Sequence, residues 1–308
     1  MSFSSTIKNE LARIAVVQFD EVLAELAGLV RMCGRIHWAG SGRLSLSLTT
    51  ENAGVARRIF TFVKRSYTED VTVSMAKNFK RKRMTSYHIE IPDRESALAL
   101  LNDVEFIHNE NVFMPVYPVS EMFIKDDGMR RAYIRGSFLG AGSVSNPERS
   151  YHLEFVCERE DHAKDLAQMI ASYGLRPKQT LRKEQHIVYF KDAEQISDML
   201  SLLGAHQGVL KFEDIRVVKD MRNRINRQVN CETANLTKTV DAAMRQIRAI
   251  EALKKAGRLP LELEEVANLR IRYPDASLKE IGQLLDPPLG KSGINHRLKK
   301  IEELAKKL

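Results

Sequence analysis

The segment AYIRGSFLGAGSVSNPERSYHLEF, residues 132–155, has the pattern of a buried helix that passes through glycines into a turn and then a strand. Its helical part carries Gly136, Gly140 and Gly142. Because glycine costs roughly 1 kcal/mol against alanine inside a helix, a helix that keeps several glycines needs a contact that compensates for them. The segment therefore predicts a place where a second backbone comes very close.

The same pattern occurs twice in the first two thirds of the chain. A shift of 108 positions places ELAGLVRMCGRI over YIRGSFLGAGSV and matches Gly28 with Gly136 and Gly34 with Gly142. In each copy there follow two strands, the second of them a clear alternating run, then an amphipathic helix, two strands joined by a basic turn, and a last helix. This order, α-β-β-α-β-β-α, predicts an α+β fold of two lobes that pack about a pseudo-twofold axis.

The glycines are then expected at the contact between the two lobes. Small residues let two helix backbones touch, and this contact can offset the low helix propensity of glycine. We expect this role for five glycines, namely Gly28, Gly34, Gly136, Gly140 and Gly142. The alternative is two unrelated helices that both carry glycine.

Length and composition are typical of a globular protein with more than one domain. The chain has 308 residues, of which 44% are hydrophobic, and this length exceeds what one core usually takes up. The three cysteines lie far apart, so their spacing indicates neither a disulfide framework nor a zinc ribbon. No apolar run is long enough for a signal peptide or a membrane helix, so we expect a cytoplasmic protein without membrane contact.

The positive charge is concentrated at the C-terminal end. Residues 222–308 contain 18 Lys or Arg against 11 Asp or Glu, a net charge of +7. Residues 1–221 contain 30 against 29, a net charge of +1. A basic domain of this kind favours a polyanionic partner such as nucleic acid. A solvated lysine surface is the plainer alternative.

The order of elements in this basic end predicts a helix-turn-helix. Residues 222–236, RNRINRQVNCETANL, are rich in asparagine and predict a hinge. Residues 237–257 then predict an amphipathic helix closed by glycine, and a second short helix ends before Pro274. Ser277 and Glu280 have the spacing of a capping box, which predicts the start of a third helix.

The last helix, expected from about Ser292, has one apolar and one polar side. Its apolar side carries Ile294, Leu298, Ile301 and Leu308. The polar side supplies donors for base edges and cations for phosphates, as a recognition helix requires. The DNA-binding candidates are Lys291, Ser292, Asn295, His296, Arg297, Lys299 and Lys300. A plain helical bundle with a charged surface is the alternative.

The two glycine helices resemble a known motif. LAGLVRMCG, residues 26–34, resembles the LAGLIDADG motif, and IRGSFLGAG, residues 134–142, resembles a degenerate copy of it. In LAGLIDADG homing endonucleases these helices form the interface between two α/β lobes, and the two sheets form a saddle over DNA. The resemblance implies the same fold for this chain. It also implies that the eighth letter of each motif would bind the catalytic divalent metal.

This chain departs from the family at the catalytic letters. The eighth letter is Cys33 in the first copy and Ala141 in the second, and the sixth letter is Arg31 or Leu139. Mg²⁺ prefers oxygen ligands, and two-metal phosphodiester cleavage needs carboxylates at its centre. The sequence DDG at residues 126–128 is better explained as a turn and helix cap. We therefore expect no metal, no cofactor and no enzymatic activity.

Two basic hairpin turns are expected as accessory contacts to nucleic acid. The first lies in KNFKRKR and the second in LRKEQ. The residues concerned are Lys80, Arg81, Lys82, Arg83, Arg182 and Lys183. Solvated turns would have the same composition.

The whole chain resembles the WhiA family. The resemblance rests on MSFSSTIKNELARI, the degenerate LAGLIDADG pair, NRINRQVNCETANL and LGKSGINHRLKKI. It implies a bacterial, nucleoid-associated regulator that binds double-stranded DNA, linked to sporulation in filamentous actinobacteria and to cell division and chromosome organisation in other Gram-positive bacteria. It also leaves room for the transcription machinery or another regulatory protein as a partner.

Two other functions stay open at this point. One is a metal-dependent endonuclease with unrecognised ligands, and the other is an RNA-binding splicing cofactor on the same scaffold. In either case we expect the same division of the chain. It consists of an N-terminal helical arm (1–20), lobe 1 (21–110), an inter-lobe linker (111–129), lobe 2 (130–219), a hinge (220–236) and a helix-turn-helix domain (237–308, with the helix-turn-helix itself at about 275–308).

Overall fold

The computed structural model describes residues 2–39, 43–78, 84–108 and 113–308. The chain divides into two compact units, Met1–Lys219 and Asp220–Leu308. Helix α9 (His206–Lys255) begins in the first unit and ends in the second.

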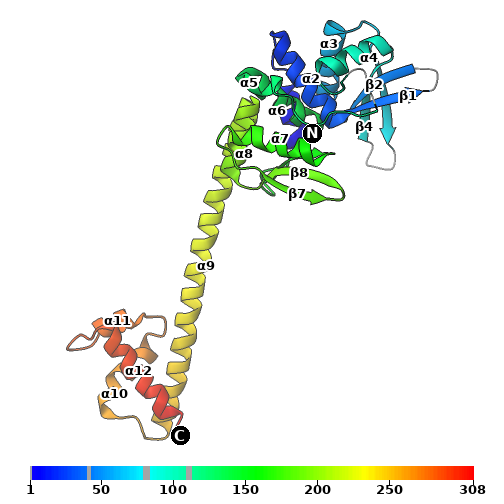
Figure 1. Ribbon diagram of the computed structural model, residues 1–308. Helices are drawn as coiled ribbons and strands as arrows, with labels where there is room; N and C mark the ends of the chain where they lie inside the picture. Colours follow the sequence, from blue (N-terminus) through cyan, green and yellow to red (C-terminus); the bar gives the residue numbers. More distant parts are fainter. Residues whose placement is uncertain (1, 40–42, 79–83, 109–112) are drawn as a thin grey trace. The chain divides into compact units, whose positions relative to one another are not determined.

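The first unit contains two lobes with the same architecture (Figure 1). In lobe 1 the sheet has the antiparallel order β1-β2-β4-β3, and in lobe 2 it has the corresponding order β5-β6-β8-β7. Lobe 1 consists of α2 (Phe19–Cys33), β1 (Gly34–Ala39), β2 (Arg43–Thr50), α3 (Ala53–Ser66), β3 (Thr72–Asn78), β4 (Met84–Ile91) and α4 (Arg94–Asp103). Lobe 2 consists of α6 (Asp127–Ala141), β5 (Gly142–Val144), β6 (Leu153–Cys157), α7 (Glu160–Ala171), β7 (Lys178–Arg182), β8 (Gln185–Phe190) and α8 (Ala193–Leu203). The predicted fold class and its duplicated order are confirmed.

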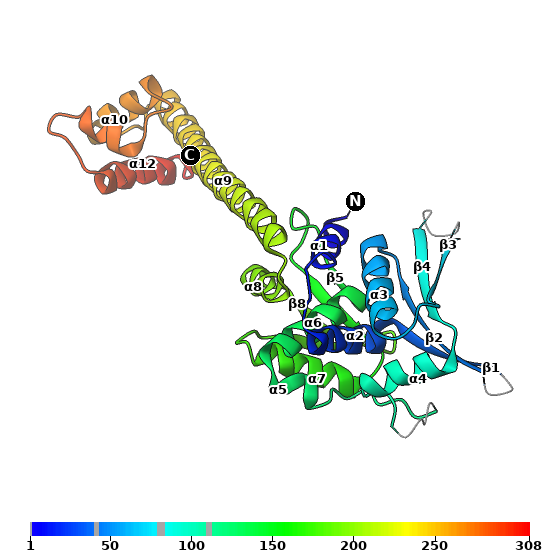
Figure 2. The same cartoon turned by 90° about the horizontal axis from the view of Figure 1, so that it is seen from above.

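Each sheet has one face covered by helices. Along β6, buried Leu153, Phe155 and Cys157 alternate with half-buried residues, the period of two that a sheet with one packed face requires. The helices α2 and α6 lie against each other along their length at the centre of the unit (Figures 1 and 2). The two lobes therefore share one continuous hydrophobic core.

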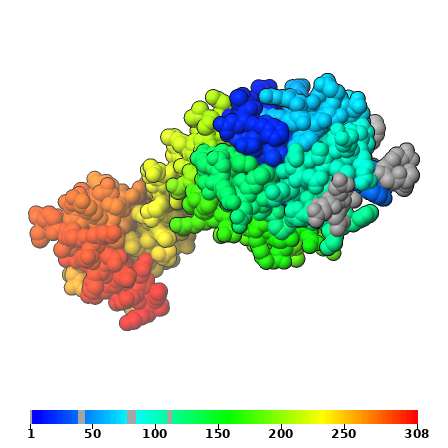
Figure 3. Space-filling view, turned by 45° about the horizontal axis from the view of Figure 1, so that its top comes forward, coloured from blue at the N-terminus to red at the C-terminus, as the bar shows by residue number. Residues whose placement is uncertain are grey.

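The N-terminal helix α1 (Phe3–Leu11) packs on lobe 1 beside α3 (Figure 3). The Ser2 hydroxyl caps its start, and Phe3, Ile7 and Leu11 are buried on one side. The Glu10 carboxylate accepts the backbone N–H groups of Gln207 and Gly208 at 2.7 and 2.9 Å, at the start of α9. This acidic cap favours the helix because the N-terminal N–H groups have no partner inside the helix. A short helix, α5 (Met122–Lys125), precedes α6.

The second unit is entirely helical. The C-terminal end of α9 packs with α10 (Leu261–Arg272), α11 (Leu278–Gln283) and α12 (Lys291–Ala305) around a small apolar core. The chain turns after α9 at Gly257, whose φ of +63° is a conformation that favours glycine. In the part of the chain that the structure describes, no helix is both long and apolar enough to cross a membrane.

The expected hinge at residues 220–236 differs from the structure. These residues are helical, and α9 continues through them to Lys255, so no helix begins at residue 237. The chain has no glycine or proline between Gly208 and Gly257 that would interrupt the helix. Asn235 and Thr237 bond back along the helix to Cys231 Sγ and the Thr233 carbonyl, so their side chains do not replace the helical hydrogen bonds.

Candidate nucleic-acid interface

The central helices α2 and α6 touch at three of the five predicted glycines. A Cβ atom added at Gly28 would lie 2.5 Å from the Tyr133 carbonyl oxygen, and one added at Gly136 would overlap the Glu25 carbonyl oxygen. At Gly140 it would lie 2.8 Å from Met32 Cβ. At these positions only glycine permits the observed distance between the two helices.

The other two glycines have a different surrounding. A Cβ atom at Gly34 would lie 2.5 Å from the Val30 carbonyl oxygen, and one at Gly142 would lie 2.7 Å from Phe138 Cα. In both cases the neighbour belongs to the preceding helix of the same lobe. Gly34 and Gly142 cap α2 and α6 with an extended backbone and begin β1 and β5. Their place in the fold is thus the turn from helix to strand, while the lobe contact is made by the glycines before them.

A buried cluster of charges holds the two lobes together. The Glu25 carboxylate on α2 is fully buried and accepts hydrogen bonds from Arg58 Nε and Nη2, and from Arg135 Nε of α6 at 2.8 Å. A buried carboxylate is strongly destabilising without such partners. The sequence contains a signal for this cluster, since Glu25 and Arg135 are the single charged residues in the stretches 22–30 and 132–141 around the motif glycines.

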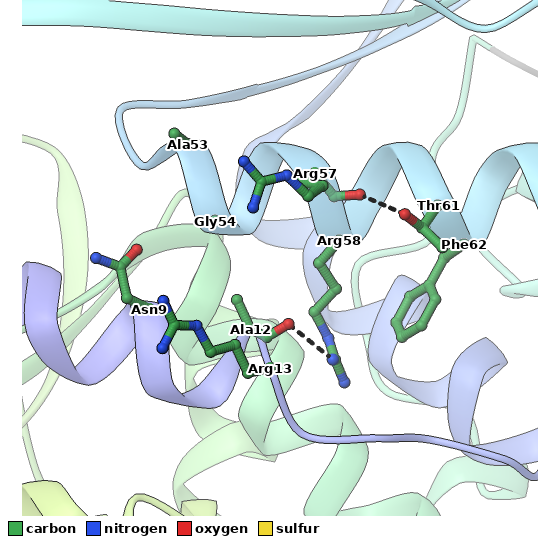
Figure 4. Close-up of a pocket in the computed structure, with 9 residues that line it drawn as sticks. All are labelled: Asn9, Ala12, Arg13, Ala53, Gly54, Arg57, Arg58, Thr61 and Phe62. Atoms are coloured by element: carbon green, nitrogen blue, oxygen red, sulfur yellow. Dashed lines mark hydrogen bonds between the residues drawn. The ribbon is translucent and has the colours of Figure 1, made fainter.

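Arg58 also joins α3 to the end of α1 (Figure 4). Its Nη1 donates to the Ala12 carbonyl at 3.2 Å and to the Ile14 carbonyl at 2.6 Å. The hollow between these helices, about 350 Å³ in volume, is also lined by the exposed arginines Arg13 and Arg57. Since Arg58 is paired with Glu25 and donates to these two carbonyl oxygens, it acts as a structural bridge between helices.

The motif letters that bind metal in LAGLIDADG enzymes have no carboxylate here. Cys33 is the last residue of α2, and its thiol donates to the Leu29 carbonyl at 3.2 Å. Burial raises the pKa of this thiol to about 12. Ala141 offers no ligand atom at the end of α6. A neutral thiol and a methyl group do not fit a hard divalent cation. Among the described residues, no group of three or more His, Cys, Asp or Glu side chains is placed to hold a metal ion.

A lysine from α1 lies at this end of the central helices instead. Lys8 Nζ donates to the Leu139 carbonyl at 3.0 Å, and burial lowers the pKa of Lys8 to about 8. A hollow of about 540 Å³ beside it is lined by Glu51 and by several hydroxyl-bearing residues, among them Ser2, Ser4, Ser5, Thr49 and Thr50. The groups at this end are therefore an amine, hydroxyl groups and the single carboxylate of Glu51.

Arg31, the sixth letter of the first motif, has a structural role. Its guanidinium is buried and donates to one backbone carbonyl oxygen of α2 and to others near both ends of the segment that follows α4. The acceptors are Ala27, Val104, Glu105, Tyr117 and Pro118. Arg31 thus fixes the start and the end of the connection between the lobes to α2. The DDG sequence acts as expected, because Asp126 caps α6 by accepting the Met129 N–H at 2.9 Å.

The accessory candidates are only partly described. Lys80, Arg81, Lys82 and Arg83 lie outside the described residues. At the tip of the β7–β8 hairpin, Arg182 Nη2 lies 3.3 Å from Glu154 Oε1, an ion pair that uses part of its charge. Lys183 is exposed in the adjoining turn with a φ of +49°.

The second unit has the geometry expected of a helix-turn-helix. Ser277 and Glu280 form a capping box at the start of α11, with both reciprocal hydrogen bonds present. Gly282 lies so close to the Leu289 backbone that an added Cβ would overlap the carbonyl oxygen, and this contact holds the turn between α11 and α12. Buried Arg270, for which the sequence predicted no role, donates to the Ala276 carbonyl at 2.7 Å and fixes the chain before α11.

Helix α12 buries one side and exposes the other. Ile294, Leu298 and Ile301 are completely buried, whereas Leu308 lies beyond the end of the helix with 53% of its surface exposed, unlike the prediction. The helix ends at Ala305, so the apolar period stops before Leu308.

The predicted DNA-binding residues all lie on α12 but differ in exposure. Lys291, Ser292, His296, Lys299 and Lys300 are exposed, and Asn295 and Arg297 are half-buried. Lys300 Nζ lies 2.6 Å from Glu262 Oε1 of α10, and this hydrogen bond lowers the pKa of the Glu262 carboxyl. Lys300 is therefore engaged within the domain, while Lys291, His296 and Lys299 offer the most accessible polar surface.

Three family models together match most of the chain. The WhiA N-terminal LAGLIDADG-like domain matches residues 20–107, and the WhiA LAGLIDADG-like domain matches residues 130–222. The WhiA C-terminal HTH domain matches residues 225–305.

Individual relatives extend over the full length. The probable cell division proteins WhiA of Thermoanaerobacter pseudethanolicus and Clostridium beijerinckii are 47% and 46% identical, and each alignment covers 100% of this chain and 98% or 99% of the relative. The crystal structure of full-length DUF199/WhiA from Thermatoga maritima is similar in fold, with a TM-score of 0.57, 24% identity, and coverage of 100% of this chain and 99% of that one. The chain belongs to the WhiA family, with two LAGLIDADG-like lobes and a C-terminal helix-turn-helix domain.

Proposed function

We propose that this chain is a sequence-specific regulator that binds double-stranded DNA through α12. The observation that carries the proposal is the two-sided character of α12, which buries Ile294, Leu298 and Ile301 and exposes Lys291, His296 and Lys299. A recognition helix needs one side for its partner helix and another for base edges and phosphates. The net charge of +7 in residues 222–308 supports the same partner.

The proposed cellular role follows the names of the relatives. The curated relatives are called probable cell division proteins, and we propose that this chain likewise regulates cell division, chromosome segregation or sporulation from the nucleoid. In this role the exposed surface of the lobes would bind the transcription machinery or another regulatory protein. Arg182 and Lys183 are proposed as accessory contacts to the DNA backbone.

Catalysis forms no part of the proposed function. Cys33 and Ala141 stand where a metal-dependent nuclease of this fold needs carboxylates. Incubating supercoiled plasmid with the protein and Mg²⁺ or Mn²⁺ tests this directly. We expect the plasmid to stay supercoiled, and nicking that follows the protein through purification would contradict the proposal.

The test of sequence-specific binding is a selection of bound DNA. Random-sequence duplexes are incubated with the full-length chain, and the bound fraction is sequenced. We expect a common short sequence, and we expect Asn295→Ala/His296→Ala to weaken the preference at some positions of it, because Asn and His donors contact base edges. Lys306→Ala/Lys307→Ala, beyond the end of α12, is the control and should select the same sequence. Unchanged selection by the α12 variant would contradict the proposal.

A further inference from the structure

Helix α9 carries an asparagine cluster on one side before it reaches the three-helix core. At 100° per residue, Asn223, Asn226 and Asn230 fall within an arc of about 60° around the helix axis. Arg227 and Lys238 lie about 40° and about 60° beyond one border of this arc, and all five side chains are exposed. We call these five residues the Asn–Arg face.

The three asparagines are costly in their present place. Asparagine in a helix interior is less favourable than alanine by up to about 0.7 kcal/mol, and an exposed helix could use alanine, glutamate or lysine instead. Their side-chain amides have no hydrogen-bond partner among the described residues, although Asn235 nearby donates to Cys231 Sγ at 3.7 Å. A row of poor helix formers with unused donors and acceptors indicates a ligand outside the chain.

The charge around this face indicates what that ligand is. Residues 222–248 contain six Lys or Arg against two Asp or Glu, a net charge of +4. This charge repels a second copy of the same helix and attracts a polyanion. Beyond Lys238, exposed Arg245 and Arg248 continue the same side of α9. From residue 223 to residue 248 the side is about 38 Å long, close to one turn of duplex DNA.

This side of α9 is free while the helix is held in its domain. Ala243, Gln246 and Ile250, which are buried, lie on roughly the opposite side of the helix, where it packs in the small core of the second unit. A ligand can therefore bind the Asn–Arg face without displacing α10, α11 or α12. This contact would add to the contact that α12 makes.

We propose that the Asn–Arg face of α9 is a second binding site for double-stranded DNA. Asn223, Asn226 and Asn230 present amides that can pair with the edge of adenine, and Arg227 and Lys238 contact flanking phosphates. The proposal rests on the proposed function, because it assigns a further DNA-contacting element to the same domain. It also gives the asparagine-rich segment a role that a hinge does not supply.

The test compares two sets of asparagines in the full-length chain. The first variant is Asn223→Ala/Asn226→Ala/Asn230→Ala, and the control is Asn235→Ala, which lies about 140° away around the same helix. Binding to the selected duplex is measured by fluorescence anisotropy, the bound length by hydroxyl-radical footprinting, and the helix content by circular dichroism. We expect the triple variant to keep or gain helix content, because alanine is the better helix former.

The expected result is a loss of binding that depends on the side of the helix. The triple variant should bind at least about tenfold more weakly, since each lost bidentate Asn–adenine pair is worth about that factor. Its footprint should be shorter by about one helical turn, roughly 10 base pairs. Asn235→Ala should bind as the unaltered chain does.

Three results would overturn the inference. If Asn235→Ala weakens binding as much as the triple variant, the segment acts through its flexibility. If the triple variant binds normally while Asn295→Ala/His296→Ala changes the selected sequence, the face does not contact DNA and only the proposed function stands. If neither variant changes binding or selection, both the inference and the proposed function fail.

Discussion

Replacing Gly136 by alanine should push α2 and α6 apart and destabilise the first unit. The added Cβ would overlap the Glu25 carbonyl oxygen, and the next nearest atoms, the carbonyl carbon and Cα of Glu25, lie at 2.9 and 3.0 Å. These are backbone atoms of a buried helix, so they cannot rotate away as a side chain would. Overpacking of this kind costs about 3 kcal/mol, and the better helix propensity of alanine returns about 1 kcal/mol.

The expected net loss is therefore about 2 kcal/mol. Urea unfolding can be followed by the fluorescence of Trp38, the single tryptophan in the sequence, which lies in β1 of the affected unit. With a slope near 2 kcal/mol/M, the midpoint should fall by about 1 M. The control is Gly293→Ala in α12, where an added Cβ would have its nearest neighbour at 3.7 Å. It should leave the Trp38 transition unchanged, and an unchanged midpoint for Gly136→Ala would refute close backbone contact.

Three further predictions concern Glu25, Lys8 and the cysteines. Glu25→Gln leaves the Arg58 charge without its counterion and should lower the free energy of unfolding by about 3 kcal/mol in the same urea assay; an unchanged midpoint would speak against a buried charge cluster. Burial lowers the pKa of Lys8 from 10.5 to about 8. Between these pH values the folded chain therefore binds fewer protons than the unfolded chain, and the contribution of Lys8 to the free energy of unfolding should rise with pH. The urea midpoint of the unaltered chain relative to that of Lys8→Met should therefore be higher at about pH 10 than at about pH 7. A difference in midpoint that stays constant with pH would contradict this. Exposed Cys231 should react first with a thiol reagent, because burial raises the pKa of Cys33 to about 12; equal labelling of both in mass spectrometry would be the opposite result.

The duplicated fold could be predicted because its determinants are local or repeat in the sequence. Gly28 and Gly136 occur at matching positions, and the alternation in each strand follows from one buried face. The Ser277/Glu280 box was predictable for the same reason, since both hydrogen bonds join residues three positions apart.

The structure differs from the sequence predictions where contacts between residues distant in sequence determine the outcome. Whether a glycine touches the partner helix or closes its own depends on tertiary contacts, so Gly34 could not be told apart from Gly28 by spacing alone. Lys300 pairs with Glu262, 38 positions away. The asparagine-rich segment has weak helix propensity, yet it stays helical because no glycine or proline interrupts α9.

The charged core was not predictable from residue type. The sequence predicted no role for Glu25, which stands just before the motif, and its partners Arg58 and Arg135 come from two other elements. A charged residue on an otherwise apolar helix face is the signal that could have found it. Such a residue requires a buried counterion, although the sequence does not show which one.

The central claim is that α12 binds duplex DNA, and the salt dependence of DNA binding tests it most directly. The affinity for the selected duplex is measured over a range of salt concentrations for the unaltered chain, for Lys291→Ala/Lys299→Ala, and for the control Lys306→Ala/Lys307→Ala. The slope of log K against log salt is negative, and each lost phosphate contact makes it less steep by about 0.9. The α12 variant should therefore show a slope that is less negative by about 1.8, while the control keeps the original slope. Equal slopes for all three proteins would contradict the account.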